Sequence, residues 1–365
     1  MSAARTLSGR AGVQVRVGIP VTGGQLVAAA RGRQYPVLFS ANAFARTYPR
    51  QHERAGGFRQ FTLPDPSQFD GLDAALDSAG FVAAARYGDY RWTVEDYYKL
   101  VAAYPWAWHA AMDYCVEEEV ARDRPMRLLR IAATAHMLGQ CNTEARRRGL
   151  ALPMPVLQGW QPDEYRLCAD WLPVIEWPAL VGLGSVCRRS VHGPDGILAI
   201  LDAIDRILPA HVRLHLFGVK SEALAILKNH PRVHSVDSMA WDFAARRARP
   251  TGRTMKFRIE QMQEWTERQR SVADQRGPGR GLQGALFDPC DFGGLAEREA
   301  AVLEALAFGY AELVMSGDVA YSDAIWHARR DAVGVIALYR SGADPDEYDE
   351  IFPGMAEKMR AHNEE

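Results

Sequence analysis

The sequence predicts an α/β protein that folds as a (β/α)8 TIM barrel with a C-terminal helical extension. Seven short apolar runs recur along the first two-thirds of the chain and end at residues 44, 81, 115, 160, 185, 218 and 241. That spacing accommodates one strand and one returning helix per unit. The runs are continuously apolar, as is typical of parallel strands covered on both faces. Seven consecutive units suit a closed eight-stranded barrel better than an open sheet.

The expected elements follow in chain order. The strands span 36–44, 72–81, 106–115, 155–160, 180–185, 212–218 and 233–241. The amphipathic stretches between them predict helices over 94–103, 127–148, 163–172, 194–208 and 222–229. The eighth strand is the least defined element, because residues 253–259 and 284–288 both qualify.

The composition changes near residue 245. Residues 246–280 carry ten Arg or Lys against four acidic residues, a local balance of +6. A Gly/Pro break at 277–281 follows, and then helical patterns over 295–314 and 318–341. We therefore expect a barrel domain over 1–290, which includes the basic segment, and a helical extension over 291–365.

Overall composition excludes several classes of protein. The 365 residues are 48% hydrophobic and 24% charged, so disorder, collagen-like structure and disulfide scaffolds are excluded. A net charge of −2 excludes a uniformly basic nucleic-acid coat. Five scattered cysteines without a CxxC pair favour reduced thiols. Neither a signal peptide nor an apolar run of ~18–20 residues is present, which predicts a soluble, cytoplasmic protein without membrane partners.

Polar side chains stand at the ends of several apolar runs. They are Asp77, Ser78, Asp113, Gln158 and Asp237, with Gly182 and Gly184 in the run VGLGS. A buried carboxylate without a partner is costly, and in a barrel the strand ends carry the functional residues. One such Asp is usually a helix cap or an ion-pair partner, for example Asp77 before a helix or Asp237 beside Arg246 or Arg247. Three carboxylates at equivalent strand ends predict a site.

Six motifs together resemble a known family. LDSAGF, AMDYC, VLQGW, VGLGSV, HLFGV and VDSMAW occur in the order found in the tRNA-guanine (queuine tRNA-ribosyltransferase-like) transglycosylases, over roughly residues 37–245. The opening LFSANAFAR, the variant DSAGF and the ending SVDSMAW more closely resemble the DpdA-type branch, which places 7-deazaguanines in DNA.

The resemblance implies a role for each strand-end residue. Asp237 would be the nucleophile that forms a covalent glycosyl-aspartate, and Asp77 the general acid/base, following the logic of retaining glycoside hydrolysis. Ser78, Asp113 and Gln158 would bind the polar edge of the base, and the backbone at Gly182 and Gly184 would complete the pocket. Phe81, Tyr114 or Trp160 would stack on the ring. No cofactor is implied.

This chain departs from the family pattern at two places. Tyr114 stands where the family usually has an acid, so a neutral 7-cyano or 7-amido base fits better than one with a cationic side arm. The family's CxCxxC…His zinc motif is absent, so we expect no metal site and no zinc subdomain. The missing zinc motif favours a substrate other than tRNA.

The expected partners are DNA, or alternatively tRNA, and a free 7-deazaguanine base. A partner ATPase or DNA-handling protein is a further possible partner that the resemblance suggests. Arg246, Arg247 and Arg249 could hold phosphates, although such a basic stretch is often only a solvated surface. Two alternatives remain open at this point: guanine exchange in tRNA, and a catalytically silent barrel that binds nucleic acid.

Overall fold

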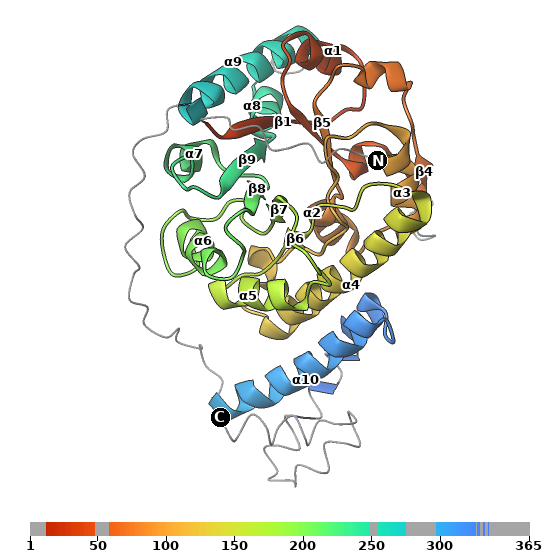
Figure 1. Ribbon diagram of the computed structural model, residues 1–365, viewed down its shortest axis with the longest axis vertical. Coiled ribbons are helices and arrows are strands. Elements are labelled where there is room, and N and C mark those ends of the chain that lie inside the picture. The colour runs from red at the N-terminus through yellow and green to blue at the C-terminus, as the bar shows by residue number, and fades with distance from the viewer. Residues whose placement is uncertain are drawn as a thin grey trace.

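The computed structural model describes residues 12–47, 58–248, 254–274, 297–325, 327–328, 331–332 and 335. Seven parallel strands form one sheet in the order β5-β2-β1-β9-β8-β7-β6. Their bounds are β1 Gln14–Ile19, β2 Val37–Ser40, β5 Ala74–Asp77, β6 Val156–Leu157, β7 Leu180–Leu183, β8 Arg213–Leu216 and β9 Val233–Ser238. The sheet is curled around a common centre with helices on its outside, as Figure 1 shows. The predicted α/β class with a parallel sheet is confirmed.

The predicted strand over 106–115 is present as a shorter extended segment between the two edges of the sheet. Leu76 of β5 forms a parallel bridge with His109, and Ala110 forms another with Met154, just before β6. The Ala107 amide donates to the Ala74 carbonyl at 2.8 Å, and the Ala111 amide donates to the Met154 carbonyl at 2.9 Å. Residues 107–111 therefore hydrogen-bond to both edges.

Of the two predictions for the remaining strand, the one over 253–259 is wrong and the one over 284–288 is not tested. Residues 255–259 begin helix α9 (Met255–Asp274), and residues 284–288 lie outside the described part of the chain. The strand is β1, which pairs in parallel with β2 and with β9. Arg16 interrupts its apolar pattern and obscures it in the sequence. In the fold the Arg16 side chain is 4% exposed and paired with Asp73 at 3.0 Å, so β1 carries a buried charged residue.

Helices cover the sheet close to where the sequence predicts them. They are α1 Gln25–Gly32, α3 Val94–Ala103, α4 Arg124–Arg148, α5 Pro162–Trp171, α6 Ile197–Asp205, α7 Ser221–Leu227 and α8 Ala240–Arg247, followed by α9. Short turns, α2 (Gly80–Val82) and a π-helix (Ala83–Tyr87), follow β5. An antiparallel hairpin of β3 (Ala45–Thr47) and β4 (Phe58–Phe61) follows β2.

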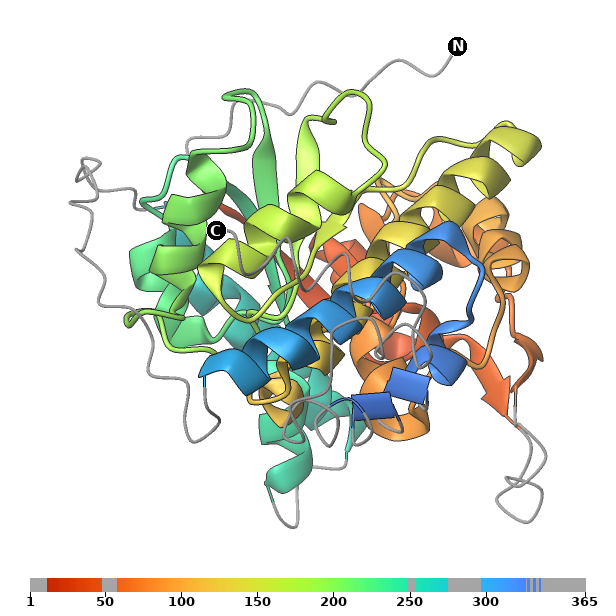
Figure 2. The ribbon, with the colours of Figure 1, turned by 90° about the horizontal axis from the view of Figure 1, so that it is seen from below.

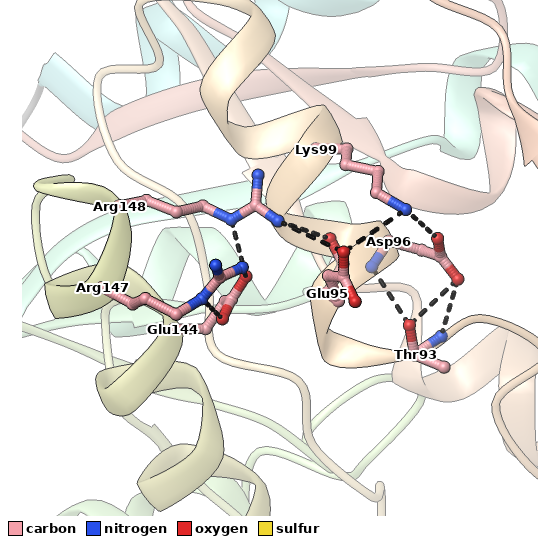
Figure 3. Close-up of polar contacts among 7 residues, drawn as sticks. All are labelled: Thr93, Glu95, Asp96, Lys99, Glu144, Arg147 and Arg148. Carbon is pink, nitrogen blue, oxygen red and sulfur yellow. Dashed lines mark hydrogen bonds and ion pairs between the residues drawn. The ribbon is translucent and has the colours of Figure 1, made fainter.

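Helix α3 shows why local sequence sets these boundaries. The Thr93 hydroxyl accepts from the Asp96 amide at 3.1 Å, and the Asp96 carboxylate accepts from the Thr93 amide at 3.3 Å, which forms a capping box. The same turn lies beside the end of α4, where Glu144 holds Arg147 and Arg148 at 2.6 Å each (Figure 3). These charges join the start of one helix to the end of the next on the surface.

Helix α10 (Glu297–Ser316), near the end of the described chain, packs on helix α4. The two helices lie side by side in both Figure 1 and Figure 2. Leu306, Tyr310 and Tyr321 pack with Leu129 of α4 and with Tyr114 in a second apolar core. Thus the helix predicted over 295–314 is confirmed. The helix predicted over 318–341 is supported where residues are described, since 321–325 are helical. The expected boundary at 290/291 lies outside the described residues.

A membrane-spanning helix is not found in the described part of the chain: none of its helices is both long and apolar enough to cross a bilayer.

Candidate active site

Five of the predicted site residues stand at the carboxyl edge of the sheet. Asp77 closes β5, Asp113 follows the 107–111 segment, Gln158 follows β6, Gly184 follows β7 and Asp237 is near the end of β9. Parallel strands end at the same edge, so the topology gathers residues that are up to 160 positions apart in the sequence.

Asp113 is the centre of the polar network at this edge. Its Oδ1 accepts from the Ser78 hydroxyl at 2.6 Å, and its Oδ2 accepts from the Gln158 side-chain amide. Tyr90 Oη contacts Ser78 Oγ at 2.9 Å, donates to the Asp113 carbonyl at 2.9 Å and lies 3.1 Å from the Asp113 amide. The structure thus brings Ser78, Asp113 and Gln158 together, as predicted.

The Gln158 amide is oriented from its other end by Ser185. The Ser185 hydroxyl donates to Gln158 Oε1 and accepts from the Val116 amide at 2.7 Å. With its oxygen occupied by a donor, the amide must turn its NH2 toward Asp113. Gly184 allows this arrangement, because a Cβ at this position would stand 2.3 Å from Gln158 Nε2. By contrast, a Cβ at Gly182 would meet the apolar side chains of Phe217, Met154 and Val156, so a contact of Gly182 with the base stays a prediction.

Strained backbone gathers next to these residues. Four non-glycine residues in the described chain have positive φ, and three of them follow β5 or β7: Ala79 at 71°, Ser185 at 56° and Arg188 at 65°. A left-handed conformation costs a non-glycine residue on the order of 1 kcal/mol, and such strain clusters at functional sites. Each of these loops carries part of the polar network.

Burial and neighbouring charge perturb two of the carboxyl groups. Burial, and then the charges of Asp113 and Asp237, raise the pKa of Asp77 to about 8. Burial also raises the pKa of Asp113 to about 6, although Ser78, Gln158 and Tyr90 oppose this by hydrogen bonding to the carboxylate. At neutral pH, Asp77 is therefore mostly protonated and Asp113 mostly ionised. Perturbed and unequal carboxyl groups of this kind are typical of acid/base sites.

Asp77 does little as a helix cap. Its Oδ2 accepts from the Ala79 amide at 3.1 Å, but the helical turn after it has Ala79 at its N-cap and no side-chain cap. As a cap, Asp77 therefore contributes one hydrogen bond to the short turn that follows β5.

Asp237 is held by the adjacent strand β8. The Gly218 amide donates to Asp237 Oδ1 at 2.9 Å, and His215 Nε2 lies 3.4 Å from the same oxygen. Gly218 adopts a left-handed conformation with φ of 67°, which a glycine tolerates at no steric cost. The interpretation of Asp237 as a partner of Arg246 is wrong, since Arg246 pairs with Asp242 of its own helix at 2.7 Å.

The three predicted stacking residues have different surroundings. Phe81 is 39% exposed, and the Arg188 guanidinium lies 5.4 Å from its ring centre. Tyr114 packs against Tyr321 at 4.1 Å and donates to Asp89 at 2.6 Å, so its ring supports the C-terminal extension. Trp160 is covered by Arg189 at 4.0 Å. Phe81 is the one of these three whose ring is largely open.

The sequence analysis did not assign Tyr90, Ser185 or His215 to the site. Ser185 ends the motif VGLGS and was within reach of the pattern, because it follows a strand directly. Tyr90 had no such signal, since it lies in a loop 13 residues after Asp77. His215 sits inside strand β8, where alternation along the strand does not show which neighbour it meets.

The basic segment is described in part. Arg246 and Arg247 end α8, whereas Arg249 lies outside the described residues. Helices α8 and α9 pack together, and Arg258 of α9 also pairs with Asp242 at 2.6 Å. Within the described ranges, no group of three or more His, Cys, Asp or Glu side chains could hold a metal ion.

Comparison with protein families gives a match over most of the barrel. The model of the family DpdA, described as DeoxyPurine in DNA protein A, matches residues 52–277, which is more than half of the chain. The chain belongs to the DpdA family. A comparison with curated proteins finds no match. Family membership implies, in general, transglycosylase chemistry that places a 7-deazaguanine in DNA, and the match covers Asp77, Asp113, Gln158 and Asp237.

Proposed function

We propose that this protein exchanges guanine in DNA for a preformed 7-deazaguanine of the 7-cyano type through a covalent glycosyl-aspartate at Asp237. The observation that carries the proposal is the set of three carboxyl groups at one sheet edge. Asp77 has a pKa raised by burial, Asp113 accepts hydrogen bonds from the Ser78 and Gln158 side chains, and Asp237 is oriented by the Gly218 amide. Retaining exchange at a glycosidic carbon needs an acid/base and a nucleophile in separate environments.

The two half-reactions balance with these groups. In the first, the Asp237 carboxylate bonds to C1′ of the deoxyribose while the bond from C1′ to guanine breaks, and protonated Asp77 gives its proton to the departing guanine. In the second, the Asp77 carboxylate takes the N9 proton of the incoming 7-deazaguanine. That base then attacks C1′ and releases Asp237. The number of glycosidic bonds is unchanged, so no nucleotide hydrolysis is needed.

Base recognition falls to Asp113, Gln158 and Ser78. A purine of the guanine type presents N1–H and a 2-amino group, and a carboxylate accepts from both. The Asp113 carboxyl already accepts hydrogen bonds from Ser78 and Gln158, so it suits this role. Phe81 offers an open ring for stacking. With Tyr114 turned into the second apolar core, its position supplies no charge for a cationic 7-substituent, which favours a neutral one.

We propose further that the sheet is a closed (β/α)8 barrel in which residues 107–111 are the strand between β5 and β6. The bridges on both sides of this segment support closure. The barrel domain would comprise residues 1–290, with 291–365 as a helical extension.

DNA would lie across the end of the barrel at which the strands terminate. The teal α8–α9 pair and the orange β3–β4 hairpin extend toward the same end of the molecule in Figure 2. Arg246, Arg247 and Arg249 belong to this region and would neutralise phosphates. Arg246 is half-exposed and already paired with Asp242. We therefore expect Arg246 to contribute less to phosphate binding than Arg247 or Arg249.

The test is exchange of radiolabelled guanine out of duplex DNA, single-stranded DNA and tRNA, with 7-cyano-7-deazaguanine as the incoming base. We expect exchange in DNA, better in single-stranded or mismatched targets because base extrusion costs a few kcal/mol in a duplex. Asp237→Asn should abolish exchange with the fold intact. Exchange only in tRNA would overturn the choice of nucleic acid. Binding of nucleic acid without any base exchange would support the alternative of a catalytically silent, nucleic-acid-binding protein.

Phosphate binding has its own measurement. Replacing Arg246, Arg247 and Arg249 with Ala should weaken DNA binding without changing affinity for the free base. The slope of log affinity against log salt should fall by about 0.7–0.9 for each phosphate that the variant no longer neutralises. An unchanged slope would mean that these arginines do not contact phosphates and only form a solvated surface.

A further inference from the structure

His215 is a fully buried histidine that faces the proposed nucleophile. It stands on β8, beside β9, with a relative exposure of 0%. We propose that His215 is a positioning residue: its Nε2–H holds Asp237 Oδ1, so that Oδ2 is the oxygen that attacks the sugar. The proposal deepens the function proposed above and rests on it, because it assumes that Asp237 forms the glycosyl bond.

Hydrogen bonding assigns the proton on the imidazole. Nδ1 lies 2.8 Å from the Ser235 hydroxyl, which can donate, whereas Nε2 faces a carboxylate oxygen, which can only accept. Burial, with the nearby Arg16 charge, lowers the pKa of His215, although Asp237 opposes this, so the ring is neutral and carries one N–H. The arrangement is satisfied when that N–H is on Nε2 and Ser235 donates to Nδ1.

The ring cannot turn away from Asp237. Trp108 lies 4.8 Å and Phe217 4.6 Å from the His215 ring centre, so aromatic surfaces flank the imidazole. Beyond Trp108, the Arg16 guanidinium lies 5.3 Å from the indole centre and is paired with Asp73. The charged groups around His215 are therefore Asp237 and Arg16. Arg16 and burial favour the neutral ring, whereas Asp237 opposes them and favours an N–H on the nitrogen that faces it, Nε2.

The Gly218 amide hydrogen-bonds to Asp237 Oδ1, and His215 Nε2, a buried nitrogen that makes no hydrogen bond with the described residues, lies 3.4 Å from the same oxygen. Among the described residues no donor is found at Oδ2. A carboxylate held by one oxygen presents the other for bond formation. When Oδ2 becomes the ester oxygen, Oδ1 becomes the carbonyl, and when the carboxylate departs, the charge returns to both. The separation of 3.4 Å between Nε2 and Oδ1 is long for a hydrogen bond, and such pairs often tighten in the reacting complex.

The experiment compares His215→Phe, His215→Gln and His109→Phe in the base-exchange assay on DNA. Phe keeps an aromatic ring but removes the donor, whereas the amide of Gln places an N–H near the Nε2 position. His109 is the matched control: it is 5% exposed, but its Nε2 contacts Tyr98 of helix α3 at 3.4 Å rather than Asp237.

We expect His215→Phe to lower kcat about 10- to 100-fold, the size of one hydrogen bond to a charged group, with KM for the base changed less than about twofold. His215→Gln should recover at least about tenfold of this loss, and His109→Phe should keep the wild-type kcat. Ser235→Ala leaves the imidazole but frees its tautomer, so it should lower kcat by a smaller factor. If His215→Phe fails to fold, the kcat of Ser235→Ala still tests the proposal.

Wild-type kcat in folded His215→Phe would overturn the proposal, and so would His215→Gln remaining as slow as His215→Phe. Failure of the proposed function looks different. In that case the wild type shows no exchange in DNA, or Asp237→Asn retains exchange, whatever substitution is made at His215.

Discussion

Asp77 links the chemistry of the site to the stability of the whole fold. Its pKa is about 8 in the folded protein against 3.8 for the unperturbed group, because burial and two neighbouring carboxylates disfavour the charged form. Between these values the folded state binds a proton that the unfolded state has lost, so stability falls as pH rises from about 4 to about 8. Asp77→Asn, which keeps an acceptor for the Ala79 amide, removes that dependence.

The expected size follows from the shift. Each pKa unit corresponds to about 1.4 kcal/mol. The free energy of unfolding of Asp77→Asn should therefore rise relative to that of the wild type by about 1.4 kcal/mol per pH unit between about pH 5 and 7. The accumulated cost of the wild-type carboxyl at pH 7 is about 4 kcal/mol by the same relation, and the difference levels off above about pH 8. The same variant should lose base exchange, because an amide cannot transfer the proton.

The assay is urea unfolding of the wild type and Asp77→Asn at several pH values from about 5 to 8.5. Asp65→Asn is the control. Asp65 is exposed and accepts from the Ser67 amide at 2.9 Å, and hydrogen bonds from Ser67 lower its pKa. Its contribution to stability is present above the unfolded pKa and is lost only in acid, so this variant should be slightly less stable by a constant amount. A constant difference for Asp77→Asn as well would mean that Asp77 is ionised throughout, and it would remove the general acid from the mechanism.

Three further predictions concern two residues around the site, each with a control substitution, and the surface cluster of Figure 3. Gly184→Ala should destabilise the protein by about 1–3 kcal/mol in urea unfolding and raise KM for the base, because the new Cβ meets Gln158 at 2.3 Å. Gly139→Ala in the middle of α4, where the new Cβ meets only Pro173 at an ordinary 3.8 Å, should instead stabilise by about 1 kcal/mol, and equal effects of the two would refute the clash. Tyr90→Phe should cost about 1 kcal/mol and raise KM, whereas Tyr104→Phe, which loses only a bond to the Pro64 carbonyl, should cost a similar amount with KM unchanged. Glu144→Gln in the surface cluster of Figure 3 should change stability by less than about 1 kcal/mol, and less at high salt; a larger loss would show that the cluster is more than a surface ion pair.

Local sequence and parallel topology were enough to predict much of this protein. Helix α3 has the expected bounds because Thr93 and Asp96 cap it within one turn. Asp77, Asp113 and Gln158 were predicted to gather because the ends of parallel strands share one edge. Ser78 and Gln158 hydrogen-bond to Asp113, and Asp77 ends β5 at the same edge.

Only the tertiary structure decided the contacts between residues far apart in the chain. Arg16 made β1 look unlike a buried strand, and its partner Asp73 lies 57 residues away, so no local pattern could reveal the pair. The contact of His215 with Asp237 depends on the register between β8 and β9, and the orientation of Gln158 depends on a hydroxyl 27 residues further on. Sequence periodicity reports which face of an element is buried. Which partner a buried polar group meets is settled by strand order and register, and these determine how each carboxyl group titrates and which of its oxygens is free to react.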